Sequence, residues 1–140
     1  ARHAIPNDPD AAVVVALREL ATTLLEPARA ALGPLRITSG YRSPRLNEAV
    51  RGSPSSAHVK GRAADVQPLK ASLVDLVQWL TGSGLAWDQC ILEHGSWDHV
   101  GVRGPKGEQR RQVLMTWAPG KYLPFDAADP RVKALGLPAV

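Results

Sequence analysis

The stretch "DQCILEHGSWDHVGV" (residues 88–102) holds two strand-like runs, "DQCILE" and "WDHVGV", separated by "HGS". Apolar runs on either side of a short turn that contains glycine predict a β-hairpin. With a three-residue loop, Ile91 lies opposite His99, and Glu93 points to the same side of the sheet as His99. Asp98, next to His99, then points to the opposite side. A two-residue loop would reverse this register.

Outward from the hairpin, caps and apolar periodicity predict three helices. Pro27 is expected to kink or split the first of them. In the third, Asp75 stands three residues after the N-cap, in the position of a capping box. The helices are expected within residues 7–33, 44–50 and 71–84, with Asp8, Ser43 and Ser72 as their N-caps.

Further strands are predicted at residues 35–41, 63–68 and 111–117. The first is expected to be buried, and the last to add an antiparallel strand to the hairpin. Residues 118–140 show little periodicity and are expected to be an irregular tail, except for a turn of helix around "DPRVKALG". The predicted fold class is therefore α/β (α+β), with a small, mainly antiparallel sheet flanked by helices.

Composition narrows the function classes. The chain has 140 residues, the usual size of one domain, and a single cysteine, Cys90, which excludes an internal disulfide and a cysteine cluster for a metal. The net charge of +4 favours a polyanionic partner. Few aromatic residues lie among the basic ones, so we expect no nucleic-acid partner. No apolar run has the length of a membrane span, and the first residues lack a signal-peptide pattern.

A second stretch, "SAHVKGRAADV" (residues 56–66), places His58 and Asp65 seven positions apart around Gly61. A hydrolytic zinc site usually has three protein ligands from histidine and carboxylate, and it keeps one position open for water. His58, Asp65 and His99 are the candidate set. The residue types alone leave another interpretation open, in which His58 is an exposed loop histidine and Asp65 a capping or turn group.

Three separated motifs occur in order: "SGYRSPRLN" (residues 39–47), S-x-H-x-x-G-x-A-x-D (residues 56–65) and "WDHV" (residues 97–100). Together they resemble the zinc D-alanyl-D-alanine carboxypeptidase family and its phage endolysin relatives, which share a fold with the hedgehog signalling domain. The resemblance covers about residues 5–117. It implies Zn²⁺ on the three candidate ligands and hydrolysis of peptides in bacterial peptidoglycan.

The resemblance also suggests residues that contact the substrate. Arg42 matches the family arginine that faces the substrate, where a guanidinium can stabilise a developing oxyanion or grip a peptide carboxylate. Ser56 matches the serine just before the first ligand and either bonds the substrate or orients His58. Tyr41 is expected to pack under Arg42 or to contact the substrate, and Trp97 to line the cleft.

The general base is where the sequence departs from the family pattern. Branches of the family have an acid three residues before the last histidine or a histidine two before it, and here these positions hold Ser96 and Trp97. The nearest acids are Glu93 and Asp98, with His94 as an outside candidate. Register favours Glu93 as the catalytic base. The alternative is that Glu93 is a rim carboxylate or a partner for basic residues of the following turn.

The sequence thus predicts a zinc-dependent peptidoglycan peptidase, a single domain over residues 1–140 with its core at about 5–117. It is expected to be a monomer that acts at the bacterial cell wall, in the periplasm, outside the cell or delivered by a phage. The bond it cuts is either D-Ala–D-Ala or L-Ala–D-Glu. The alternative is a catalytically silent zinc- or wall-binding module, favoured by Ser96.

Overall fold

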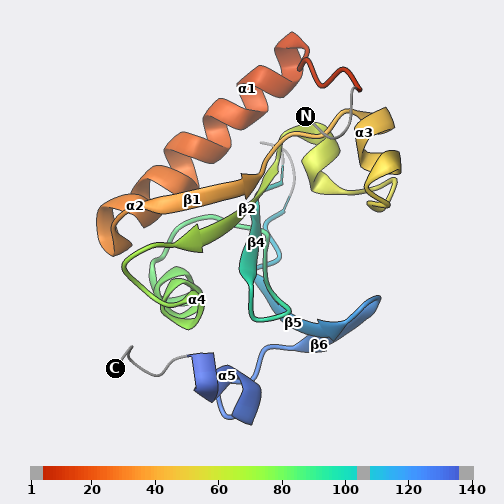
Figure 1. Ribbon diagram of the computed structural model, residues 1–140. Helices are drawn as coiled ribbons and strands as arrows, with labels where there is room; N and C mark the ends of the chain where they lie inside the picture. The colour runs from red at the N-terminus through yellow and green to blue at the C-terminus, as the bar shows by residue number, and fades with distance from the viewer. Residues whose placement is uncertain (1–4, 104–107, 136–140) are drawn as a thin grey trace.

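A six-stranded sheet with helices packed on one face forms the centre of the molecule (Figure 1). The computed structural model describes residues 5–103 and 108–135. Within them the strands lie in the order β1-β2-β4-β3-β5-β6. The helical elements are α1 (Ala11–Leu20), a π-helical turn (Ala21–Leu25), α2 (Glu26–Leu32), α3 (Pro44–Ala49), a 3₁₀ turn (Ala57–Lys60), α4 (Leu73–Gly82) and α5 (Pro130–Leu135). The strands are β1 (Leu35–Ser39), β2 (Ala63–Pro68), β3 (Gln89–Glu93), β4 (Trp97–Gly101), β5 (Gln112–Ala118) and β6 (Lys121–Pro124).

The helices largely follow their local signals. Ser43 caps α3 and Ser72 caps α4 with the predicted capping box. The first helix starts later than expected, because the carboxylate of Asp10, not that of Asp8, accepts the free N–H of Val13 at 2.9 Å. A π-helical turn separates α1 from α2 just before Pro27, which confirms that the long helix is interrupted there.

The hairpin has the predicted register. Ile91 pairs with His99 and Glu93 pairs with Trp97, so the loop holds three residues. β2 joins the other edge of β4, where Asp65 pairs directly with His99. These central strands are antiparallel, as the predicted fold class requires.

The direction of β5 differs from the prediction, because β5 runs parallel to β3. Both edges of β4 are already occupied, by β2 and by β3. The chain that leaves β4 at Gly101 therefore crosses the start of β3, and it enters β5 with Gln112 beside Gln89. A strand that begins beside the first residue of β3 and pairs along its length runs parallel to β3. The other neighbouring pairs among the described strands are antiparallel.

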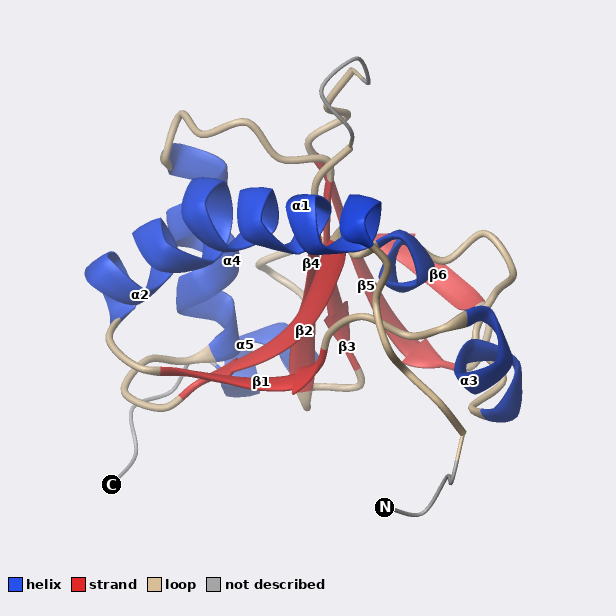
Figure 2. Cartoon of the chain, turned by 90° about the horizontal axis from the view of Figure 1, so that it is seen from above, coloured by secondary structure: helices blue, strands red, loops and turns tan. Residues whose placement is uncertain are grey.

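Alternation along the central strands divides the sheet into two faces. One face packs against α1, α2 and α4, which gather on one side in Figure 2. Its buried core includes Leu20, Leu24, Ala64, Val66, Leu76, Val77, Leu80, Trp87, Cys90 and Val100. The opposite face carries the intervening positions, among them Asp65 and His99. None of the described helices has both the length and the apolar character needed to cross a membrane.

Two further expectations are corrected at the margins of the sheet. Strand β1 is an edge strand whose central residues are exposed, and it is not buried as predicted, since it has a partner strand only in β2. The segment after residue 117 is not irregular throughout. β6, which was not predicted, pairs with β5 through residues such as Leu123, opposite Met115. α5 forms where a turn of helix was expected, and its Val132 is buried in a second small core with Leu92.

Candidate metal centre

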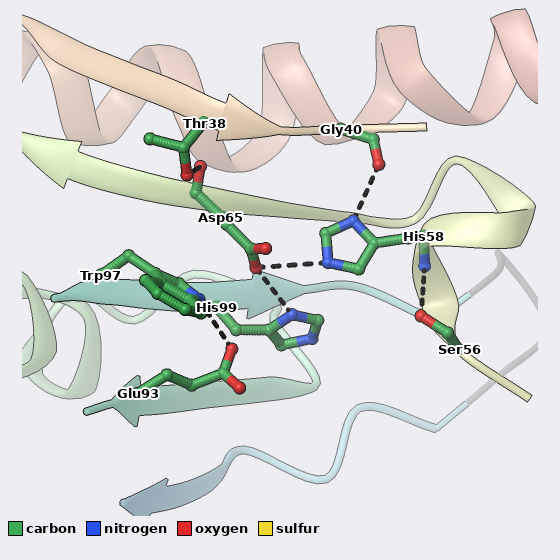
Figure 3. A network of polar contacts seen from close by, with 8 residues as sticks. All are labelled: Thr38, Gly40, Ser56, His58, Asp65, Glu93, Trp97 and His99. Carbon is green, nitrogen blue, oxygen red and sulfur yellow. Dashed lines mark hydrogen bonds and ion pairs between the residues drawn. The ribbon is translucent and has the colours of Figure 1, made fainter. Parts of the chain in front are cut away.

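Three side chains from separate elements converge on the open face of the sheet (Figure 3). His58 comes from the 3₁₀ turn, Asp65 from β2 and His99 from β4. One ligand atom of each lies within 4.8 Å of the others. Since Asp65 and His99 are cross-strand partners, the backbone ladder fixes the distance between them. The candidate ligand set of the sequence is thus brought together in space.

The short segment before β2 holds His58 in place. The hydroxyl of Ser56 accepts the backbone N–H of His58 at 3.3 Å and so caps the turn that carries it. Gly61 ends the turn at a φ of +69°, and a Cβ there would lie 2.9 Å from Cγ1 of Val13. Glycine is needed both for the left-handed backbone and for the close approach of α1.

A backbone carbonyl fixes the tautomer of His58. Nδ1–H of this ring donates to the carbonyl oxygen of Gly40 at 2.8 Å, since a carbonyl can only accept. In the neutral ring, the lone pair of Nε2 then points at Oδ1 of Asp65, 3.2 Å away. Two acceptors at this separation need a cation between them, either a proton or a metal ion. Nδ1 of His99 lies 3.1 Å from the same oxygen.

The electrostatics also favour a cation. Burial alone would raise the pKa of Asp65, but the close interactions of its carboxylate with His58 and His99 outweigh it and lower the pKa to about 2. The carboxylate is therefore ionised at neutral pH, although the side chain is only 13% exposed. Two imidazole nitrogens and one carboxylate oxygen are the donor set of hydrolytic zinc sites, which keep a fourth position for water. The residues present fit Zn²⁺.

Glu93 lies on the same face as the three candidate ligands, as the register predicted. Its carboxylate Oε2 accepts the indole N–H of Trp97 at 2.8 Å, a bond that holds it beside the ring of His99 (Figure 3). Asp98 points into the core on the opposite face, where no described residue bonds its carboxyl oxygens. Burial, together with the charge of Glu93, raises the pKa of Asp98 well above its usual range. Glu93 is thus a carboxylate in the cleft, whereas Asp98 is a carboxyl group in the core.

The three candidate ligands lie in a cleft of about 790 Å³. Arg42 and Ser56 line the cleft with the loop after α3, while Trp97 and His94 line it from the hairpin. The backbone N–H of Arg42 donates to the carbonyl oxygen of His58 at 3.1 Å, which joins the arginine segment to the ligand segment. Tyr41 is not among the described residues that line the cleft.

Sequence reasoning missed Asp88, which lines the cleft, and Asn47, which packs against Gly52 of the cleft lining. Asp88 accepts a bidentate pair of hydrogen bonds from Arg110 and forms an ion pair with Arg103 at 3.1 Å. Burial would raise the pKa of Asp88, but Arg110 outweighs it and lowers the pKa. Asn47 is buried in α3 and donates to the carbonyl oxygen of Ser53 at 2.8 Å. Asn47 is the last residue of the motif "SGYRSPRLN", which is the signal that could have pointed to it, whereas its burial is seen only in the fold.

Comparison with known proteins identifies a family. Residues 7–101, more than half of the chain, match the family model described as peptidase M15. The matched range contains the three candidate ligands together with Arg42 and Glu93. No curated protein matches the chain.

Proposed function

The chain belongs to the peptidase M15 family, and on this premise we propose that it is a zinc metallopeptidase that hydrolyses stem peptides of bacterial peptidoglycan. The observation that carries the proposal is the convergence of His58, Asp65 and His99 on one point of the cleft, with Glu93 on the same face. Such a set holds an ion and still leaves room for water and substrate.

Bound Zn²⁺ would supply a Lewis acid that polarises the scissile carbonyl and lowers the pKa of water to about 7. The residues of the chain divide the remaining tasks. Glu93 takes the proton of the attacking water and later gives it to the leaving amine, while Trp97 keeps its carboxylate oriented. Arg42 donates to the carbonyl oxygen as negative charge develops there, or holds a peptide carboxylate. Ser56 orients His58 through the backbone.

A Glu93→Gln variant tests the assignment of the base. The amide keeps the shape of the side chain but cannot take a proton, so hydrolysis of purified peptidoglycan should fall by about 10²–10⁴-fold while zinc content stays at one ion per chain. Mass spectrometry of the products measures the rate. It also shows whether the D-Ala–D-Ala or the L-Ala–D-Glu bond is cut. Full activity in the variant would show that another group is the base.

A second candidate is a catalytically silent zinc- or wall-binding module, favoured by Ser96 at the position where family branches carry an acid. Ser96 is exposed, and its hydroxyl donates to the carbonyl oxygen of His94 within the hairpin loop. Zinc binding without any cleavage of peptidoglycan by the parent chain would support this candidate and contradict the peptidase proposal.

We further propose that the chain works as a monomeric single domain at the cell wall, as a bacterial enzyme or as a phage endolysin. The net charge of +4 supports this location, because peptidoglycan and its attached polymers are anionic. Release of stem-peptide fragments from intact cell walls, together with a sedimentation measurement of mass, tests both statements.

A further inference from the structure

Helix α3 ends in an unusual way at Arg51. After the last helical turn, Arg51 adopts a left-handed backbone with a φ of 61°. Its N–H donates to the carbonyl oxygen of Glu48, and the next N–H, of Gly52, donates to that of Asn47. This position after a helix is most often occupied by glycine, because a side chain strains the left-handed conformation. The chain therefore carries an arginine where its backbone favours glycine.

The glycine that follows has a packing reason of its own. A Cβ added to Gly52 would overlap the side-chain amide of Asn47 and would lie 2.9 Å from a terminal guanidinium nitrogen of Arg42. Gly52 is thus required by the close contact of Asn47 and Arg42 with the backbone. A left-handed backbone at a residue that also lines the cleft points to a functional role for the Arg51 side chain.

Arg51 belongs to the same wall of the cleft as Arg42. Among the described residues, neither arginine has a carboxylate within 4.0 Å of its side-chain nitrogens, whereas the acids that line the cleft have partners of their own. Asp88 is bound by two arginines, Asp65 faces the two imidazoles and Glu93 accepts from Trp97. This wall of the cleft therefore presents two positive charges to whatever enters it.

We propose that Arg51 binds a carboxylate of the substrate that lies away from the scissile bond, and so makes the cleft selective for acidic peptides over their amidated forms. The inference rests on the proposed peptidase function. Arg42 acts at the reacting group, while the exposed guanidinium of Arg51 offers a planar fork that matches a second carboxylate. A neutral carboxamide in that place has no charge to pair with the guanidinium.

The test uses synthetic stem peptides with every carboxylate free and the same peptides with one carboxylate at a time converted to a carboxamide. For the zinc-loaded parent protein, amidation of one particular carboxylate of the peptide should lower kcat/KM about tenfold or more, through a higher KM. In Arg51→Gly the difference in KM between the acidic peptide and its amidated form should disappear, because the variant binds both peptides equally. Arg51→Lys should restore part of it, since the charge remains but the fork is lost.

Arg111 offers a matched control. It is also exposed and left-handed, with a φ of 53°, and it does not line the cleft. Arg111→Gly should relieve the same backbone strain, with a Tm no lower than that of the parent, and should keep the parental preference for the acidic peptide. If Arg51→Gly discriminates between the peptides as the parent does, the inference is overturned and the peptidase function stands. If the parent cleaves none of the peptides, the proposed function fails and the inference fails with it.

Discussion

Replacing Asp65 by asparagine gives the most direct test of the electrostatics at the candidate metal centre. In the metal-free protein the two imidazoles lower the pKa of this carboxyl from its ordinary value of 3.8 to about 2. A shift of this size corresponds to about 2 kcal/mol of folding free energy at 1.36 kcal/mol per pH unit. Because the folded pKa is depressed, the contribution is present above pH 3.8 and is lost as the pH falls towards 2.

Chemical denaturation in EDTA, carried out from pH 5 to pH 2, measures this contribution of Asp65 to the folding free energy. The parent should be more stable than Asp65→Asn at pH 5, and the difference should shrink by about 2 kcal/mol as the pH reaches 2. A second series is measured at pH 7 with zinc in place of EDTA. Zinc should stabilise the parent and leave the stability of the variant almost unchanged, since the variant has lost its anionic ligand. Equal stabilisation of both proteins by zinc would show that the ion binds elsewhere. A pH-independent difference would refute the role of the imidazoles.

Three further changes test the packing and positioning of the site. Gly61→Ala should lower the free energy of unfolding by at least about 1 kcal/mol. Gly84→Ala should lower it less, because Gly84 has a similar φ of +73° but open space around it. Urea denaturation of both variants therefore separates backbone strain from the clash with α1. Leu24→Ala, at a fully buried core position, should cost about 2–5 kcal/mol by the same method, against about 0.5 kcal/mol or less for exposed Val14→Ala. Trp97→Phe keeps the aromatic packing but removes the hydrogen bond to Glu93, so kcat/KM on peptidoglycan fragments should fall about tenfold with zinc content unchanged; an unaltered rate would mean that Glu93 needs no such support.

The features that the sequence predicted correctly depend on local chemistry. The caps of α3 and α4 need only a serine and the amide three residues later. The register of the hairpin follows from the length of its loop, and it placed Glu93 and His99 on one face before any tertiary information was used. The candidate ligands were found because His58, Asp65 and His99 lie in two of three motifs whose order along the chain resembles one family.

The features that the sequence did not predict depend on distant contacts. The parallel direction of β5 is set by β2, which occupies the free edge of β4 and forces the chain across β3. The exposure of β1 depends on its place at the edge, which no local pattern encodes. Likewise, the partner of Asp88 at the cleft is Arg110, which is 22 residues away along the chain.

The distribution of the site over the fold has a functional consequence. Asp65 and His99 sit on paired central strands whose alternate residues, such as Ala64 and Val100, are buried in the core. A slip of one residue in this register would move the candidate ligands into the core, so the packing that stabilises the fold also specifies the geometry of the candidate metal centre. Arg42 and Arg51 belong instead to segments around α3 that no sheet hydrogen bond constrains. Under the proposed function, substitutions there would change which peptide is accepted without disturbing the candidate ligands, so substrate choice and metal binding would be separated within one small domain.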